Sequence, residues 1–204
     1  MPSSDPRLIS PIMYEVLCKR PRSILDVGMG TGKWGALSRE YLDIWWRISQ
    51  TFDGLLHGAA IVDGIEVFPQ YETLLWQAYN TVIVGDACKL MPSMPWHDMI
   101  ICVEVLEHIE REAGILLIKQ MLARCSSLIL TYTNGDQEAA WGNEHEKHVS
   151  RWCEADLAAL CPSVRKLVSI NRITEAFCME SGSRSVRIDA AGVGALKDMK
   201  ERDR

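Results

Sequence analysis

Acidic and histidine side chains gather in two short segments of this 204-residue chain. In "VEVLEHI", Glu104, Glu107 and His108 occupy positions i, i+3 and i+4, which would place all three on one side at the opening of a helix. In "GNEHEKHVSRW", His145 and His148 follow an apolar run that is typical of a strand. Carboxylates and imidazoles together are ligands for a divalent cation such as Mg²⁺, Mn²⁺ or Fe²⁺. A metal site is one interpretation, and hydrogen bonds from these side chains to neighbouring loops are the other.

A parallel sheet would bring the two segments together. Apolar strand-like runs alternate with helix-like periodic segments, which is typical of an α/β fold with helices on both faces of the sheet. The strand-like runs are residues 24–27, 60–67, 81–84, 99–103 and 128–133. Helices are predicted at residues 7–19, 33–48, 70–79, 110–124 and 154–160. Loops at the carboxyl ends of the fourth and fifth strands would face the same crevice, so His148 is placed to supply a fourth metal ligand.

The last part of the chain has a different pattern. Three short strand-like runs, "VRKLVSI", "EAFCME" and "RSVRIDA", follow Trp152 and predict an antiparallel end to the sheet. We expect a single domain over residues 1–204. It would contain an N-terminal helix within 1–22, an insertion at 45–58 whose tryptophans pack on the core or cover a ligand, and a solvated tail at 196–204.

Composition and charge exclude several classes of protein. No stretch approaches the roughly 18 uncharged residues that a membrane span needs, and the N-terminus lacks the features of a secretory signal. Seven scattered cysteines without a C-x-x-C pair fit neither a disulfide framework nor a zinc knuckle. A formal net charge of −5 argues against a broad grip on nucleic acid. We therefore expect a cytoplasmic protein that acts on a small molecule rather than on nucleic acid or a membrane.

A glycine-rich turn in "SILDVGMGTGKWG" joins the first strand-like run after residue 22 to a predicted helix. A nucleoside-triphosphate P-loop is disfavoured, because Trp34 stands where Ser or Thr would ligate magnesium. A nicotinamide dinucleotide would use Gly30, Gly32 and Gly35 with an acid roughly 20 residues further on. Asp53 is near that distance but stands in "FDG", a turn-like context without a preceding strand. An NAD-dependent oxidoreductase is the alternative from another class.

An acid at the end of the first strand favours a different ligand. Asp26 precedes the turn that contains Gly28 and Gly30, and this arrangement suits a ligand with an ammonium and a carboxylate group. The methionine half of S-adenosylmethionine is such a ligand. The stretch "LDVGMGTGKWG" resembles motif I of the class I S-adenosylmethionine-dependent methyltransferases. This resemblance implies a Rossmann-like, doubly wound, mostly parallel seven-stranded sheet with an antiparallel C-terminal end, and cofactor contacts at Asp26, Gly28 and Gly30.

Three later motifs resemble the same family in the same order. By this resemblance Glu66, in "VDGIEVF", would accept hydrogen bonds from both ribose hydroxyls of the cofactor. In "VIVGDACKL", Asp86 would read the adenine amino group, and the backbone amide of Ala87 would meet the ring. The segment "HDMIICVEVLEHI" resembles the fourth motif, in which the strand end passes the cofactor at Glu104. The match spans residues 24–152, and the insertion lengthens the interval between the first two motifs.

Two branches of the family carry a similar histidine pattern. Ubiquinone-biosynthesis O-methyltransferases have a segment similar to "VEVLEHI". The small-RNA 3′-terminal 2′-O-methyltransferases pair such an E-x-x-E-H with a later histidine shortly before a tryptophan. The second resemblance implies that Glu104, Glu107, His108 and His148 bind a metal, although many metal-free members also contain "LEH".

The segment after the fifth strand resembles a group of bacterial methyltransferases in which Gly-Asn, Glu, His and Trp follow that strand. The resemblance implies an acceptor pocket formed by Tyr132, Asn134, Trp141, Asn143 and His145, with His148 beside it. Methyl transfer from a sulfonium is an in-line displacement, so the enzyme must align the acceptor with the methyl group and exclude water. An oxygen acceptor also loses a proton. Either His108 or His148 would act as general base, or a metal would lower the pKa of the hydroxyl.

We therefore expect an S-adenosylmethionine-dependent methyltransferase that acts on a hydroxyl of a small molecule or sugar, with or without a divalent metal. An RNA 2′-O-methyltransferase is the alternative within the fold. A non-catalytic family member that keeps the cofactor is a third alternative.

Overall fold

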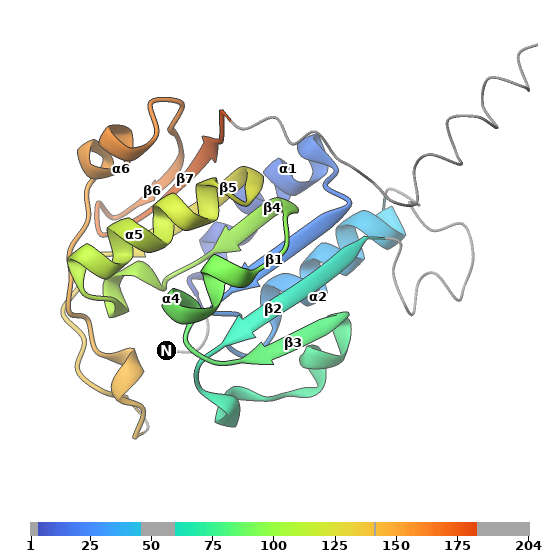
Figure 1. Cartoon of the computed structure of the whole chain (residues 1–204), viewed down its shortest axis with the longest axis horizontal. Coiled ribbons are helices and arrows are strands. Elements are labelled where there is room, and N and C mark those ends of the chain that lie inside the picture. Colours follow the sequence, from blue (N-terminus) through green and yellow to red (C-terminus); the bar gives the residue numbers. More distant parts are fainter. Residues whose placement is uncertain (1–3, 46–59, 141, 183–204) are drawn as a thin grey trace, which may run out of the picture.

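The computed structural model describes residues 4–45, 60–140 and 142–182. Within these residues, strands form one sheet in the order β3-β2-β1-β4-β5-β7-β6 (Figure 1). The strand bounds are β1 Ser23–Val27, β2 Ile61–Glu66, β3 Thr81–Val84, β4 His97–Cys102, β5 Cys125–Thr133, β6 Arg165–Ile170 and β7 Thr174–Glu180. The pairs among β1 to β5 are parallel, whereas β7 is antiparallel to both β5 and β6. The predicted α/β, Rossmann-like sheet with an antiparallel end is confirmed.

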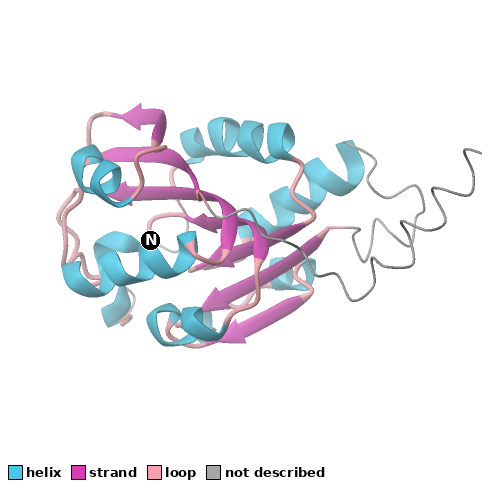
Figure 2. Cartoon of the chain, turned by 45° about the horizontal axis from the view of Figure 1, so that its top comes forward, coloured by secondary structure: helices cyan, strands magenta, loops and turns pink. Residues whose placement is uncertain are grey.

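Helices cover both faces of this sheet (Figure 2). One face packs against α1 (Ile9–Lys19) and α2 (Lys33–Arg39), which continues as a π-helix over Glu40–Trp45. The other face packs against α4 (Ala87–Leu90), α5 (Arg111–Leu122) and α6 (Glu154–Leu160). Short 3-10 helices lie at Pro6–Leu8, Pro69–Tyr71, Leu74–Ala78, Met91–Ser93, Leu106–His108 and Glu144–Glu146.

Successive residues of the central strand β1 face two different cores. Ile24 is buried with Ile12 of α1, whereas Leu25 is buried with Leu117 of α5. This follows from the alternation of side chains along a strand. Burying an aliphatic side chain of this size stabilises the fold by about 1.5–3 kcal/mol. Because β1 is anchored on both faces, the turn that follows it starts from a well-packed base.

One predicted helix is wrong. Residues 70–79 form two 3-10 helices, Pro69–Tyr71 and Leu74–Ala78, instead of one α-helix. Thr73 between them is extended, and its side chain accepts a hydrogen bond from the backbone N–H of Leu75, which starts the second helix. The insertion beyond residue 45, the run "RSVRIDA" and the C-terminal tail lie outside the described residues.

Candidate functional site

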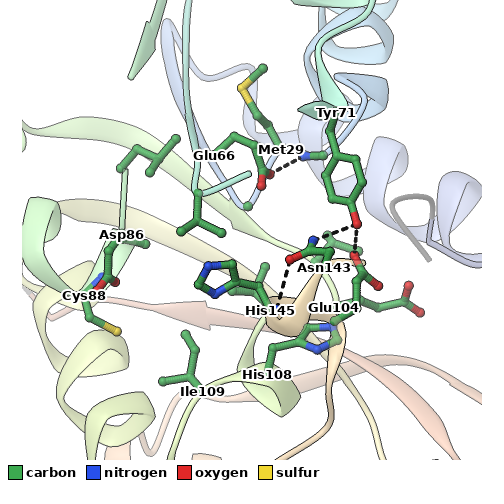
Figure 3. Close-up of a pocket in the computed structure, with 18 of the residues that line it drawn as sticks. Met29, Glu66, Tyr71, Asp86, Cys88, Glu104, His108, Ile109, Asn143 and His145 are labelled. Atoms are coloured by element: carbon green, nitrogen blue, oxygen red, sulfur yellow. Dashed lines mark hydrogen bonds between the residues drawn. The ribbon is translucent and has the colours of Figure 1, made fainter. Parts of the chain in front are cut away.

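A cavity of about 370 Å³ lies at the carboxyl ends of the central strands (Figure 3). Its walls come from the glycine turn after β1, the ends of β2, β3 and β4, and the loops after β2 and β5. The lining includes the predicted site residues Gly28, Gly30, Glu66, Asp86, Ala87, Glu104, His108, Asn143 and His145. Ligands of open α/β sheets bind at this edge, and this volume is within the range of small-molecule sites.

The glycine turn forms one wall because its backbone lies open to the cavity. Gly28 and Gly30 have φ values of 70° and 53°, in the left-handed region that favours glycine. A Cβ at Gly28 would lie 2.4 Å from Cγ2 of Val105, so a side chain is also excluded by packing. The two glycines let the backbone of the turn approach a ligand closely.

Glu66 lies at the end of β2 and faces the turn. Its Oε2 accepts a hydrogen bond from Gly30 N at 2.8 Å (Figure 3). Its Oε1 accepts one from Phe68 N at 2.9 Å. Burial raises the pKa of this carboxyl, and the backbone hydrogen bonds oppose that rise. Each oxygen keeps a lone pair beyond these bonds, so the carboxylate can still accept hydrogen bonds from a diol in the cavity.

Asp86 and Ala87 form the wall that follows β3. The Oδ1 atom of Asp86 accepts a hydrogen bond from Cys88 N at 2.9 Å and caps α4, and Oδ2 lies 3.4 Å from the ammonium of Lys89. Asp86 therefore stabilises the turn locally. It also lines the cavity, so its predicted role toward an adenine amino group stays a prediction.

Asp26 does not line the cavity, which corrects the expectation that it contacts the ligand directly. Its side chain is 1% exposed beneath the turn, and Oδ2 accepts a hydrogen bond from the hydroxyl of Tyr79 at 2.5 Å. Burial raises the pKa of Asp26 to about 7, while the bond from Tyr79 lowers it and the charge of Glu66 raises it. The Asp26 carboxyl therefore supports the turn from beneath.

Glu107, His108 and His148 form a group whose ligand atoms all lie within 4.8 Å of one another. Nδ1 of His108 bonds the carbonyl of Lys147 at 3.2 Å, and Nδ1 of His148 bonds the carbonyl of Gly135. With Nδ1 acting as donor, the lone pair of each ring is on Nε2. A hydrogen bond that fixes the second nitrogen is typical of histidines that bind metals.

Glu107 supplies an oxygen without a partner to this group. Its Oε1 accepts a hydrogen bond from Thr133 N at 3.0 Å, but its buried Oε2 has no hydrogen-bond partner among the described residues. Burial, and next the charge of Glu104, raise the pKa of Glu107 to about 8. A buried carboxylate oxygen without a partner is costly, and a cation would satisfy it. The donor set therefore fits a divalent metal.

Glu104 lies outside this group, in contrast to the predicted set of four ligands. The helix expected at the opening of α5 is replaced by the 3-10 helix Leu106–His108, and Glu104 has a φ of 54°. Its carboxylate lines the cavity and accepts a hydrogen bond from Thr133 Oγ1 at 3.2 Å. The i, i+3, i+4 argument fails because these residues do not share one helix.

The loop after β5 contributes Asn143, His145 and Glu146 to the cavity. The amide of Asn143 donates to the hydroxyl of Tyr71 at 2.9 Å, and the same hydroxyl donates to Glu146 at 2.6 Å (Figure 3). The Oδ1 of Asn143 accepts a hydrogen bond from His145 N. Asn143 thus holds the loop in place. The sequence did not point to Tyr71, because it stood within a predicted helix.

Two other predicted acceptor residues do not reach the cavity. Tyr132 is 1% exposed, its ring stacks on Phe177 with centroids 5.6 Å apart, and its hydroxyl bonds Glu175. Asn134 bonds both the backbone N–H and the carbonyl of Trp152. Tyr132 is buried in the core beside β7, and Asn134, which follows β5, is bound to the backbone of Trp152, so both side chains are structural. Trp141 lies outside the described residues.

Packing within the protein explains Gly32 and Gly35, two of the glycines that a nicotinamide dinucleotide would use. A Cβ at Gly32 would lie 3.1 Å from the backbone of Leu75, and one at Gly35 would lie 2.2 Å from Cζ of Tyr79. Neither glycine lines the cavity among its described walls. Asp53, the acid of the dinucleotide alternative, lies outside the described residues. The glycine spacing that suggested a dinucleotide is therefore explained by close contacts with the segment that connects β2 to β3.

Lys33 was not predicted as a site residue. It lines the cavity, where its ammonium donates to the carbonyl of Ser4 at 2.7 Å, and burial lowers its pKa. Among the described lining residues it is the only lysine or arginine, against carboxylates at Glu66, Asp86, Glu104, Glu110 and Glu146.

The helices in the described part of the chain include none that is long and apolar enough to cross a membrane.

Solved structures that resemble this fold include S-adenosylmethionine-dependent methyltransferases. Magnesium protoporphyrin IX methyltransferase from Synechocystis PCC 6803, with bound S-adenosylhomocysteine, superposes with a TM-score of 0.56 and 15% identity over 86% of this chain and 83% of that chain. The N-terminal domain of EvdMO1, also with S-adenosylhomocysteine, superposes with a TM-score of 0.60 and 14% identity over 88% of this chain and 82% of that chain. The methyltransferase domain of bacterial CtHen1-C superposes with a TM-score of 0.55 and 14% identity over 86% of this chain and 97% of that chain.

The chain therefore has the class I methyltransferase fold. Comparison of the sequence with protein-family models and with curated protein sequences gives no match.

Proposed function

We propose that the protein is an S-adenosylmethionine-dependent methyltransferase that acts on a hydroxyl group of a small molecule. The observation that carries this proposal is the contact between Gly30 and Glu66 at the wall of the cavity. It combines an open glycine backbone with a buried carboxylate that can accept from a diol. Asp86 and Ala87 stand on a neighbouring wall, where an adenine ring would lie.

These residues fit the cofactor in chemical type. The cofactor supplies an activated methyl group on a sulfonium when it is bound. Gly28 and Gly30 would let the backbone approach its methionine part, and Glu66 would orient its ribose. With the cofactor oriented, the protein has to align an acceptor oxygen and exclude water, and apolar side chains such as Val103 and Ile109 help to do so.

Two explanations account for the removal of the acceptor's proton, and they assign different roles to His108. Burial, with the neighbouring His148, lowers the pKa of His108, so its imidazole is neutral and can accept a proton at Nε2. Alternatively Glu107, His108 and His148 hold a divalent metal, which would lower the pKa of a bound hydroxyl. In that case His108 is a ligand and cannot be the base.

The acceptor is a small hydroxylated molecule or sugar in this proposal. An RNA 3′ end is the second candidate, since the group of Glu107, His108 and His148 resembles the metal set of RNA 2′-O-methyltransferases. The carboxylates around the cavity disfavour RNA, because they would repel its phosphates. Among the described lining residues, only Lys33 is a lysine or arginine that offsets this negative charge. Filter binding with short RNA ends distinguishes the two candidates.

The decisive test of the cofactor is calorimetric titration with S-adenosylhomocysteine, with NADH as the comparator. We expect micromolar binding of S-adenosylhomocysteine by the wild type and a loss of at least about tenfold in Glu66→Ala. The control is Glu112→Ala, which removes an exposed carboxylate of α5 that does not line the cavity. Binding of NADH without S-adenosylhomocysteine would contradict the proposal. Incubation with methyl-labelled cofactor and hydroxylated acceptors then tests the methylated atom, and label found only on nitrogen or carbon would exclude O-methylation.

A further inference from the structure

Three side chains spaced three residues apart, Thr73, Trp76 and Tyr79, join the β2–β3 connection to the glycine turn. Trp76 Nε1 donates a hydrogen bond to the carbonyl oxygen of Gly30 at 2.8 Å. Thr73 Oγ1 donates to the next carbonyl oxygen, that of Thr31, at 2.7 Å. Two successive carbonyl groups of the turn are therefore held by side chains from one segment.

Tyr79 holds both flanks of the same turn. Its hydroxyl donates to Asp26 at the end of β1 and accepts from the N–H of Gly35 in α2, at 3.0 Å. The ring is 8% exposed and occupies the space that a Cβ at Gly35 or Gly64 would need. A single phenol thus ties the strand before the turn to the helix after it.

Of the three, Trp76 lies within the 3-10 helix Leu74–Ala78, whereas Thr73 and Tyr79 are its extended N-cap and C-cap residues. In one continuous α-helix each step of three residues would rotate the side chain by about 60°, and the three could not all face the turn. The contacts with the turn favour the 3-10 helix over the α-helix that the sequence predicted.

The peptide groups around Gly30 are held from two sides. The N–H of Gly30 donates to Glu66, and its carbonyl oxygen accepts from Trp76. Gly30 lines the cavity, whereas Trp76 is 9% exposed and lies behind the turn. Any effect of Trp76 on a ligand must therefore pass through the conformation of the turn.

We propose that Thr73, Trp76 and Tyr79 are positioning residues that hold the glycine turn in the conformation that binds the cofactor. This inference rests on the proposed function, because it takes the turn as the cofactor site. A turn that is already ordered binds its ligand without losing further conformational entropy. Without the Trp76 bond, the carbonyl of Gly30 loses its partner and the turn becomes less restricted.

The test is calorimetric titration of the full chain with S-adenosylhomocysteine. Trp76→Phe keeps an aromatic ring but removes the donor, and we expect the Kd to rise about three- to tenfold. The matched control is Trp152→Phe. Trp152 is also buried and donates its indole N–H to Leu106 O and Ser150 Oγ, away from the turn. It should lower the melting temperature comparably and leave the Kd within twofold.

A second pair of variants separates the contribution of the Thr73 hydroxyl to binding from any effect of the substitution on general stability. Thr73 is exposed, so Thr73→Val and Thr73→Ser change little packing, and only the serine variant keeps the donor. We expect a Kd about threefold higher for valine and a Kd equal to the wild type for serine. Wild-type affinity in both Trp76→Phe and Thr73→Val, or equal weakening in Trp152→Phe, would overturn this inference alone. A wild type that does not bind S-adenosylhomocysteine would overturn the proposed function as well.

Discussion

The rings of His108 and His148 lie edge to face, with centroids 4.8 Å apart and ring planes at 69°. His108 comes from the 3-10 helix after β4, and His148 comes from the loop after β5. Each ring uses Nδ1 to bond a backbone carbonyl, so both Nε2 atoms remain for another partner. Together with the unpartnered Oε2 of Glu107, this arrangement offers three ligand atoms that fit a divalent cation.

The first prediction concerns this cation. After chelator treatment, the wild type should bind one Mn²⁺ per chain in a calorimetric titration. Glu107→Gln and His148→Ala should weaken binding by at least tenfold, because each removes one of three ligands. Glu104→Gln should change the affinity less than threefold, since Glu104 lies outside the group. An equal loss in Glu104→Gln would restore the four-ligand site, and a wild type that binds no Mn²⁺ would favour the metal-free interpretation.

The second prediction is a pH dependence of stability that arises at Asp26. Its ordinary pKa of 3.8 rises to about 7 in the fold, because burial disfavours the charged form. Between these values the folded state holds a proton that the unfolded state has lost. This group therefore stabilises the fold fully below about pH 4, and that stability is lost as the pH rises through about 7.

Asp26→Asn should remove this contribution. Relative to the wild type, the variant should gain about 2–3 kcal/mol in free energy of unfolding between pH 5 and pH 8, as measured by urea denaturation. Asp136→Asn is the control, because Asp136 has a 93% exposed side chain. If the difference between Asp26→Asn and wild type is the same at both pH values, Asp26 is ionised throughout.

The third prediction concerns the close approach of α2 to Tyr79. Gly35→Ala should lower the free energy of unfolding by about 1–3 kcal/mol, because the new Cβ would lie 2.2 Å from the tyrosine ring. The better helix propensity of alanine, worth up to about 1 kcal/mol, offsets only part of this cost. Gly182→Ala, with no atom within 4 Å of its Cβ, should be neutral. Equal stability of both variants would show that Tyr79 moves aside easily.

The fourth prediction concerns the bridge from Tyr71 to the loop after β5. Tyr71→Phe should lower the free energy of unfolding by about 1–3 kcal/mol, since the buried carboxylate of Glu146 loses a donor. Tyr14→Phe, at a tyrosine that is 65% exposed, should change it by less than about 0.5 kcal/mol. A double-mutant cycle with Glu146→Gln should give a coupling of about 0.5–3 kcal/mol. Additive effects would mean that this hydrogen bond contributes nothing.

Local patterns in the sequence predicted most of the fold correctly. The apolar runs that became β1 to β5 are short and bounded by turn residues, and these signals depend only on neighbouring residues. The glycine turn was also recognisable, because Gly28 and Gly30 adopt backbone conformations that other residues avoid. Residues 70–79 were predicted as a helix from periodicity, yet their conformation depends on contacts with a turn far away in the chain.

The sequence by itself determined the order of the strands and helices, the glycine turn and the acids at the strand ends, because these follow from local conformational preferences. Only the tertiary structure decided what each polar side chain contacts. It placed Glu66 against Gly30, buried Asp26 beneath the turn, and brought Tyr71 to Glu146. It also left Glu104 outside the group that Glu107, His108 and His148 form. Such contacts depend on register and on the packing of distant segments, and residue spacing along the chain does not encode them directly.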